Sequence, residues 1–161
     1  MNQLKRKQTE WIEEQSVSLE FFSEEPITPL HQKVPLGDRH KTLIVIPSFN
    51  EEASIGQVLE DVKQNAPEIP VLVVSDGCID QTAQIAEEHG AQVISLPYNS
   101  GYGVALQTGF LYARKHNYSI VVQMDADGQH DPACIQDLLS AVNNSDVDVA
   151  VSYTHLRAHE T

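Results

Sequence analysis

Residues 43–62 read LIVIPSFNEEASIGQVLEDV, and this stretch shows the pattern that the rest of the chain repeats. Its first four residues are all apolar, as in a strand that is buried on both faces of a sheet, and Pro47 is predicted to end that strand. Apolar residues then recur at the spacing of one helix face, at Ile55, Val58, Leu59 and Val62. The stretch therefore predicts a buried strand, a polar loop and a helix.

The same alternation of strand and helix continues along the chain. Further strands are expected at 71–74, 93–96, 120–124 and 147–151, and further helices at 82–89, 104–116 and 132–142. Asp80 is expected to be the N-cap of the helix at 82–89, and Gly90 to end it. This order predicts an α/β fold, with a mostly parallel sheet covered by helices on both faces. Ligands bind such sheets outside the carboxyl ends of the strands.

Composition restricts the class of protein further. The chain has 161 residues, enough for one domain with a core, and its formal net charge is −13, which argues against a nucleic-acid partner. Two cysteines, Cys78 and Cys134, are too few for a disulfide framework, so we expect a reducing cytosol and packed thiols. No apolar run approaches the roughly 20 residues that a membrane-spanning helix needs.

The segment 124–130, MDADGQH, contains two carboxylates separated by one residue. Asp125 and Asp127 follow a predicted buried strand, where their repulsion is costly unless a cation offsets it. Mg²⁺ typically takes one or two carboxylates together with substrate phosphate oxygens, and Mn²⁺ accepts the same ligands. Gly128 lets the backbone come close to a ligand. On residue types alone, the segment predicts either a divalent cation site or an ordinary Asp-Gly turn.

The loop at 47–52, PSFNEE, follows the first predicted strand. Phe49 is suited to packing on a nucleotide base, and Glu51 to accepting a hydrogen bond from a base or a ribose. The same residues also suit a strand end followed by an acidic first helical turn, which favours the helix dipole. Without other information, the second interpretation is the stronger one.

Two more polar loops follow the next two strands. In 75–80, SDGCID, Asp76 lies at a strand end, where it can accept a hydrogen bond from a base N–H. In 99–105, NSGYGVA, Gly103 belongs to a glycine-containing loop that opens a helix, and helix N-termini bind phosphate readily. Neither loop has the glycine spacing of a dinucleotide-binding or phosphate-binding motif.

Taken together, the four loops resemble family 2 glycosyltransferases of the GT-A fold, in particular the dolichyl-phosphate mannose synthases and polyprenyl-phosphate sugar transferases. The matching stretches are IPSFNEE, SDGCIDQTAQIA, NSGYGVALQTGF and VVQMDADGQHDP, within residues 42–151. Each motif is modest, but the ordered set is specific. The resemblance implies an inverting, metal-dependent transfer of a sugar from a UDP- or GDP-linked donor. It also implies polyprenyl phosphate, at a membrane surface, as the acceptor.

The resemblance assigns roles to particular residues. The nucleotide sugar would be bound by Pro47, Phe49, Glu51, Asp76, Gly103 and Asp125. Mg²⁺ or Mn²⁺, with the diphosphate, would be approached by Asp125, Asp127 and Gln129, and Asp127 is the expected direct ligand. No catalytic residue is implied within this chain.

Three departures from the family pattern stand out. Ser75 and Cys78 occupy positions where the family often has Asp and Ser. The segment 152–161, SYTHLRAHET, replaces the expected Gly-Ser-Arg-aromatic continuation and resembles translated sequencing-adapter sequence. We therefore expect it to be a non-native tail that follows a truncated fold.

These observations divide the chain into three parts. Residues 1–40 are expected to be a polar extension and linker, 41–151 a nucleotide-sugar-binding GT-A half-domain, and 152–161 the non-native tail. The acceptor pocket, any catalytic base and any membrane helices would lie beyond, so the chain alone is expected not to turn over. The expected location is cytoplasmic, with membrane association in the full-length protein.

Two other functions remain as alternatives. A nucleotidyltransferase that makes nucleotide sugars would need a glycine-rich loop with basic residues after the first strand. The acidic segment 50–52 argues against this function. A non-enzymatic scaffold with the same fold would show no metal-dependent nucleotide affinity. The intact pair Asp125 and Asp127 argues against the scaffold.

Overall fold

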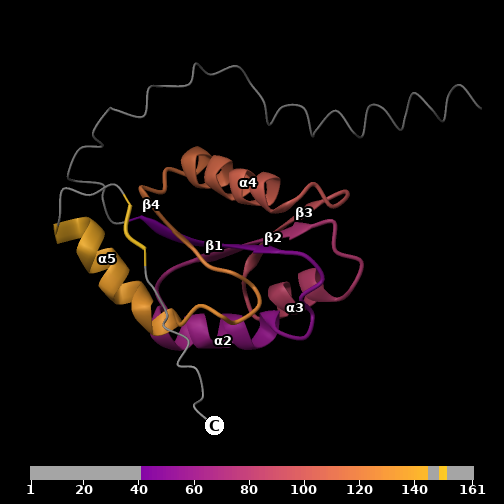
Figure 1. Cartoon of the computed structure of the whole chain (residues 1–161), viewed down its shortest axis with the longest axis horizontal. Helices are drawn as coiled ribbons and strands as arrows, with labels where there is room; N and C mark the ends of the chain where they lie inside the picture. The colour runs from indigo at the N-terminus through magenta and orange to yellow at the C-terminus, as the bar shows by residue number, and fades with distance from the viewer. Residues whose placement is uncertain (1–40, 145–148, 152–161) are drawn as a thin grey trace, which may run out of the picture. The chain divides into compact units, whose positions relative to one another are not determined.

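A computed structural model describes residues 41–144 and 149–151 of the chain. Four parallel strands form one sheet in the order β3-β2-β1-β4 (Figure 1). The strands are β1 (Thr42–Ser48), β2 (Val71–Asp76), β3 (Gln92–Leu96) and β4 (Ile120–Gln123). The helices are α2 (Ile55–Asn65), α3 (Thr82–Glu88), α4 (Tyr102–Lys115) and α5 (Ile135–Asn144).

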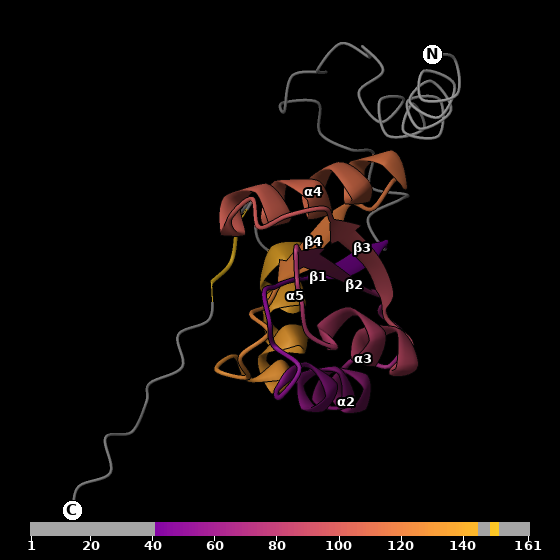
Figure 2. The ribbon, with the colours of Figure 1, turned by 90° about the vertical axis from the view of Figure 1, so that its right-hand side faces the viewer.

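Helices cover both faces of the sheet, which confirms the predicted α/β class. Figure 2 shows α4 on one face, with α2, α3 and α5 on the other. The alternation of side chains along β1 explains the two layers, because Leu43 and Val45 pack in the α4 layer while Ile44 and Ile46 pack in the opposite layer. All four are fully buried. A strand buried on both faces needs an unbroken apolar sequence, which β1 has.

The strand β1 continues through Pro47 to Ser48, so the prediction that Pro47 ends it was wrong. Pro47 is paired in register with Val74 of β2. The Val45 carbonyl accepts a hydrogen bond from the Met124 N–H, just past β4. Alternate residues of a strand bond to the same neighbour, so the nitrogen of Pro47 faces the side where β4 has already ended. Its missing N–H therefore removes no ladder hydrogen bond.

The predicted helices are confirmed, with shifted boundaries. All four residues of the apolar stripe on α2 are buried. The helix α4 begins at Tyr102, two residues earlier than expected, and Gly101 before it has a φ of 94° that favours glycine. The last helix opens with a 3₁₀ turn, Pro132–Cys134, before α5.

The ends of α3 show one correction and one confirmation. The N-cap is Gln81 rather than Asp80. Asp80 lies one residue before the N-cap, and its side chain accepts a hydrogen bond from the Thr82 N–H. Gly90 has a φ of 85° and donates to the Glu87 carbonyl, so it ends the helix as predicted.

The expected strand at 147–151 is wrong for residues 149–151, which form no strand and expose Val149 and Val151. The rest of that strand, the extension at 1–40 and the tail at 152–161 lie outside the described residues. Within the described ranges, no helix has both the length and the apolar character that a membrane crossing requires.

Close packing of α4 on β1 depends on Gly109. A Cβ atom at this position would lie 2.3 Å from Cγ1 of Val45. We predict that Gly109→Ala lowers the free energy of unfolding by about 1–3 kcal/mol, the usual effect of overpacking a core. Urea unfolding followed by far-UV circular dichroism measures the change.

Gly103→Ala in the same helix is the matched control, because a Cβ there meets no atom within 4 Å. It is expected to be neutral or stabilising by up to about 1 kcal/mol. Equal stability of the two variants would contradict the close approach of α4 to β1.

Candidate functional site

A cavity of about 450 Å³ lies at the carboxyl edge of the sheet. This volume is within the range of small-molecule sites. Its lining comes from the carboxyl ends of β1 and β2 and from segments that follow β1, β3 and β4, namely Pro47, Ser48, Phe49, Glu51, Asp76, Asn99, Tyr102, Ala105, Asp125, Ala126 and Asp127. Six of the predicted site residues therefore meet in one cavity.

Two predicted site residues, Gly103 and Gln129, do not line this cavity. Gly103 is exposed in the first turn of α4, and Gln129 is exposed in the turn after β4. Their predicted contacts with the nucleotide sugar and the metal ion remain predictions.

The loop after β1 is tied to the loop after β2 by reciprocal hydrogen bonds. The Asn50 N–H donates to the Cys78 thiol at 3.3 Å, and the Ile79 N–H donates to the Asn50 side-chain oxygen at 3.0 Å. The thiol in turn donates to the Ser48 carbonyl at 3.4 Å. Asn50 has a φ of 54°, in the left-handed region that asparagine tolerates better than most residues. These bonds hold Phe49 between two fixed neighbours, with 45% of its surface exposed.

A second set of bonds joins the start of α2 to the start of α3. The Glu51 N–H donates to the Thr82 hydroxyl at 2.8 Å and the Glu52 N–H to Asp80 at 3.1 Å. Partial burial raises the pKa of Asp80, but hydrogen bonds from Thr82 and from the Glu52 N–H outweigh it and lower that pKa below its ordinary value of 3.8. The ionised form of Asp80 is thus the one that fits the folded loops.

Asp76 has a structural role that the sequence did not reveal. Its carboxylate is only 3% exposed, and its two oxygens accept from the Ser100 N–H at 2.7 Å and the Gly101 N–H at 2.8 Å. Next to it, Gly77 has a φ of 65° and lies so close to Asn99 that a Cβ would be 2.3 Å from the Asn99 nitrogen. Asp76 therefore anchors the loop that opens α4, and its predicted contact with a base remains a prediction.

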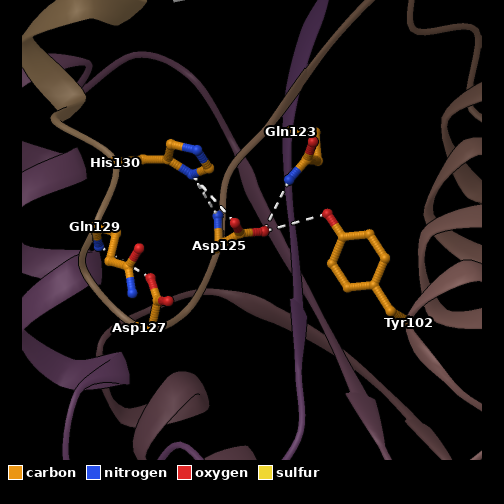
Figure 3. Close-up of polar contacts among 6 residues, drawn as sticks. All are labelled: Tyr102, Gln123, Asp125, Asp127, Gln129 and His130. Atoms are coloured by element: carbon orange, nitrogen blue, oxygen red, sulfur yellow. Dashed lines mark hydrogen bonds and ion pairs between the residues drawn. The ribbon is translucent and has the colours of Figure 1, made fainter. Parts of the chain in front are cut away.

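Asp125 lies at the centre of a small hydrogen-bond network (Figure 3). Its Oδ1 accepts from the Tyr102 hydroxyl at 3.2 Å and from the Gln123 amide at 2.9 Å. Its backbone N–H donates to Nδ1 of His130 at 3.1 Å. Oδ2 of Asp125 lies 3.6 Å from the same Nδ1.

Asp127 lies in a tight turn that presents its side chain to the cavity. Its Oδ1 accepts from the Gln129 backbone N–H at 2.9 Å, and Gly128 between them has a φ of 77° (Figure 3). Oδ2 of Asp127 has no hydrogen-bond partner among the described residues. The segment is thus an Asp-Gly turn, and the turn also places a carboxylate on the cavity wall.

The lining fits a divalent cation only when a substrate completes its coordination. Nowhere in residues 41–144 and 149–151 do three or more metal-ligating side chains cluster. The described lining includes four carboxylates, from Glu51, Asp76, Asp125 and Asp127, and no Lys or Arg. Mg²⁺ commonly binds through one or two carboxylates plus substrate phosphates. Asp125 and Asp127 supply such a pair.

Tyr102 and Gln123 are site residues that the sequence analysis missed. Partial burial, together with the charge and hydrogen bond of Asp125, raises the pKa of Tyr102, so its phenol remains a proton donor at neutral pH. The sequence feature that could have identified Tyr102 is its position inside the predicted loop 99–105. Its distance of 23 residues from Asp125 gave no reason to pair the two.

Comparison with known proteins decides the family. A sequence model described as "Glycosyl transferase family 2" matches residues 43–158. The chain belongs to this family. The region that matches glycosyl transferase family 2 includes every residue that lines the cavity, and all of the described sheet except Thr42.

The names of several relatives describe an activity, and two of these names refer to mannose. The chain is 33% identical over 117 residues to polyprenol monophosphomannose synthase of Mycolicibacterium smegmatis, covering 69% of this chain and 44% of the relative. It is 34% identical over 112 residues to undecaprenyl-phosphate mannosyltransferase of Micrococcus luteus, covering 66% of this chain and 46% of the relative. The chain thus spans about half the length of these curated relatives.

Solved structures show the same fold. Glucosyl-3-phosphoglycerate synthase from Mycobacterium tuberculosis, in complex with UDP, superposes with a TM-score of 0.57 at 25% identity. The match covers 66% of this chain and 41% of that one. The same enzyme has been crystallised with Mn²⁺, UDP and glucosyl-3-phosphoglycerate, and also with Mg²⁺ and UDP.

The bonds around Asp80 predict a pH dependence of stability. Because the folded-state pKa lies below 3.8, ionised Asp80 stabilises the fold above that pH, and the stabilisation is lost as pH falls through the folded-state value. We expect Asp80→Asn to lower the free energy of unfolding by about 1 kcal/mol at neutral pH, because a neutral amide oxygen accepts hydrogen bonds from Thr82 and Glu52 less strongly than an ionised carboxylate does. Denaturant unfolding as a function of pH measures the difference, which should shrink in acid.

Asp137→Asn, on the exposed face of α5, is the matched control for this experiment. A surface substitution of this kind should change the free energy of unfolding by no more than about 0.5 kcal/mol. If the difference in free energy of unfolding between wild type and Asp80→Asn stayed constant down to the lowest pH, the ionised carboxylate would have no stabilising role.

Proposed function

We propose that this chain supplies the donor-binding portion of an inverting glycosyltransferase, which transfers a sugar from a nucleoside-diphosphate sugar to polyprenyl phosphate. One observation carries the proposal. Phe49, Glu51, Asp125 and Asp127, from loops far apart in sequence, line a single cavity at the carboxyl edge of a parallel sheet. This is the edge where α/β sheets bind nucleotides.

The cavity suits both parts of a nucleoside diphosphate. The exposed ring of Phe49 offers a flat apolar surface for a base, and the Glu51 carboxylate offers an acceptor for a base or ribose. The second oxygen of Glu51 is oriented by a hydrogen bond from the Ser54 hydroxyl at 2.8 Å. The hydrogen bonds between Asn50 and the loop after β2 keep the neighbouring ring of Phe49 in place before any nucleotide binds.

The carboxylates explain why a divalent cation would be needed. A diphosphate would be repelled by a lining that carries four acidic and no basic side chains among the described residues. Bound by Asp125 and Asp127, Mg²⁺ or Mn²⁺ would neutralise the charge that develops on the leaving nucleoside diphosphate. The chain's own contribution is to hold these two carboxylates at one edge of the cavity.

The names of relatives and the chemistry of transfer support polyprenyl phosphate as the acceptor. Two of them are named for transfer to polyprenol or undecaprenyl phosphate. A phosphate oxygen is already anionic, so it can attack the anomeric carbon with little help from a general base. Attack on the face opposite the leaving group inverts the configuration. The relatives are about twice as long as the matched region, and we propose that this chain alone binds the donor without completing transfer.

Calorimetric titration of the full chain with UDP and with GDP, each with and without Mn²⁺, tests the proposal. Circular dichroism first establishes that the chain is folded. We expect one of the two nucleotides to bind, and Mn²⁺ to increase its affinity. Asp127→Asn should abolish this increase because it removes a ligand carboxylate, while Asp137→Asn on α5 should leave it unchanged.

Each outcome selects one of the candidate functions. Binding of either nucleotide that requires Asp127 and Mn²⁺ supports donor binding and identifies the base. A folded chain that ignores both nucleotides would favour a non-enzymatic scaffold. A nucleotidyltransferase, the alternative, would instead bind UTP or GTP and release pyrophosphate once a sugar 1-phosphate is added to take the nucleotidyl group.

A further inference from the structure

We propose that Tyr102 is a positioning residue of the donor site: its hydroxyl, together with the Gln123 amide, holds one oxygen of Asp125 and leaves the other for the cation. This inference rests on the proposed function, because it concerns how Asp125 meets a divalent cation bound with a nucleoside diphosphate. Tyr102 acts through Asp125 and is not assigned a contact with the reacting atoms.

The two oxygens of Asp125 have different surroundings. Oδ1 accepts two hydrogen bonds, from Tyr102 at 3.2 Å and from Gln123 at 2.9 Å. Oδ2 lies 3.6 Å from Nδ1 of His130, which is too far for a hydrogen bond. Oδ2 therefore receives no hydrogen bond from the described residues. A carboxylate fixed through one oxygen presents the other in a defined direction, as outer-shell partners of metal ligands commonly ensure.

Tyr102 can position another group because its own backbone is fixed. It is the first residue of α4, directly after the Ser100 and Gly101 amides that the buried carboxylate of Asp76 binds. One turn further on, Ala105 is fully buried against the sheet. A continuous set of contacts thus runs from the end of β2, through the start of α4, to the carboxylate after β4.

The lengths of the two hydrogen bonds to Asp125 indicate how much metal affinity each donor contributes. The Tyr102 bond of 3.2 Å is long for an O–H donor, for which about 2.7–2.8 Å is usual, whereas the Gln123 bond has an ordinary length for an N–H donor. Loss of an outer-shell partner typically lowers metal affinity by about 10–100-fold. We therefore expect an effect of about 10-fold for the Tyr102 hydroxyl, and a larger one for Gln123.

A competing role for Tyr102 is contact between its ring and the nucleotide, since the side chain is 53% exposed and lines the cavity. Tyr102→Phe separates the two roles, because it keeps the ring and removes the hydroxyl. Positioning of Asp125 predicts a loss confined to the Mn²⁺-dependent part of nucleotide affinity. Ring contact predicts no loss.

The experiment compares four versions of the 161-residue chain by calorimetry with UDP and GDP, with and without Mn²⁺. They are wild type, Tyr102→Phe, Gln123→Ala and the control Tyr98→Phe, whose side chain is 70% exposed and does not line the cavity. We expect Tyr102→Phe to reduce the Mn²⁺-dependent gain in affinity about 10-fold and to leave metal-free affinity within about 2-fold. Gln123→Ala should show the same pattern more strongly, and Tyr98→Phe should match wild type.

Three results would overturn the inference. In the first, Tyr102→Phe keeps the full Mn²⁺-dependent gain. In the second, it lowers affinity equally with and without Mn²⁺, which would show a general effect on the pocket. In the third, wild type itself shows no Mn²⁺-dependent gain, which would overturn the proposed function as well. In the first two, wild type behaves as a donor-binding protein, so they leave the proposed function intact.

Discussion

Parallel pairing of β1 with β2 on one side and β4 on the other is the constraint on which the site depends. Parallel strands end at the same edge, so the loops after them are neighbours whatever their separation in sequence. The central strand can take this position because Leu43, Ile44, Val45 and Ile46 bury both of its faces completely. A polar residue among these four would have to lie in one of the two cores.

Four aspartates near this edge fall into two groups. Asp76 and Asp80 accept hydrogen bonds from backbone N–H groups, which fix the orientation of their carboxylates. Asp125 and Asp127 are turned toward the cavity, and each has an oxygen that receives no hydrogen bond among the described residues. The first group shapes the loops, while the second is available for a ligand. The same residue type thus serves structure and binding at one edge of the sheet.

Close backbone approach is the second requirement of the site. Gly77 allows the loop after β2 to touch the loop before α4, and Gly109 allows α4 to lie against Val45. Together with the Asp76 carboxylate, these contacts determine where Tyr102 begins the helix. The position of the phenol beside Asp125 is therefore a consequence of packing at several distant points. The hydrogen bond between Tyr102 and Asp125 joins segments 23 residues apart, so no local sequence pattern predicts it.

Sequence by itself determined the α/β class, the four strands, the helices between them and the family, because periodicity and ordered motifs are local properties of the chain. It also identified Phe49, Glu51, Asp125 and Asp127, which do line one cavity. Local patterns misjudged Pro47, since the sequence does not show that β4 ends before the proline nitrogen needs a partner.

Only the tertiary structure decided the hydrogen-bond partners of these residues. The bonds from Ser100 and Gly101 to Asp76, and from Tyr102 to Asp125, depend on strand order and on the register between neighbouring strands. Hydrogen bonds require distances near 3 Å, and only the folded sheet brings groups more than 20 residues apart within that range.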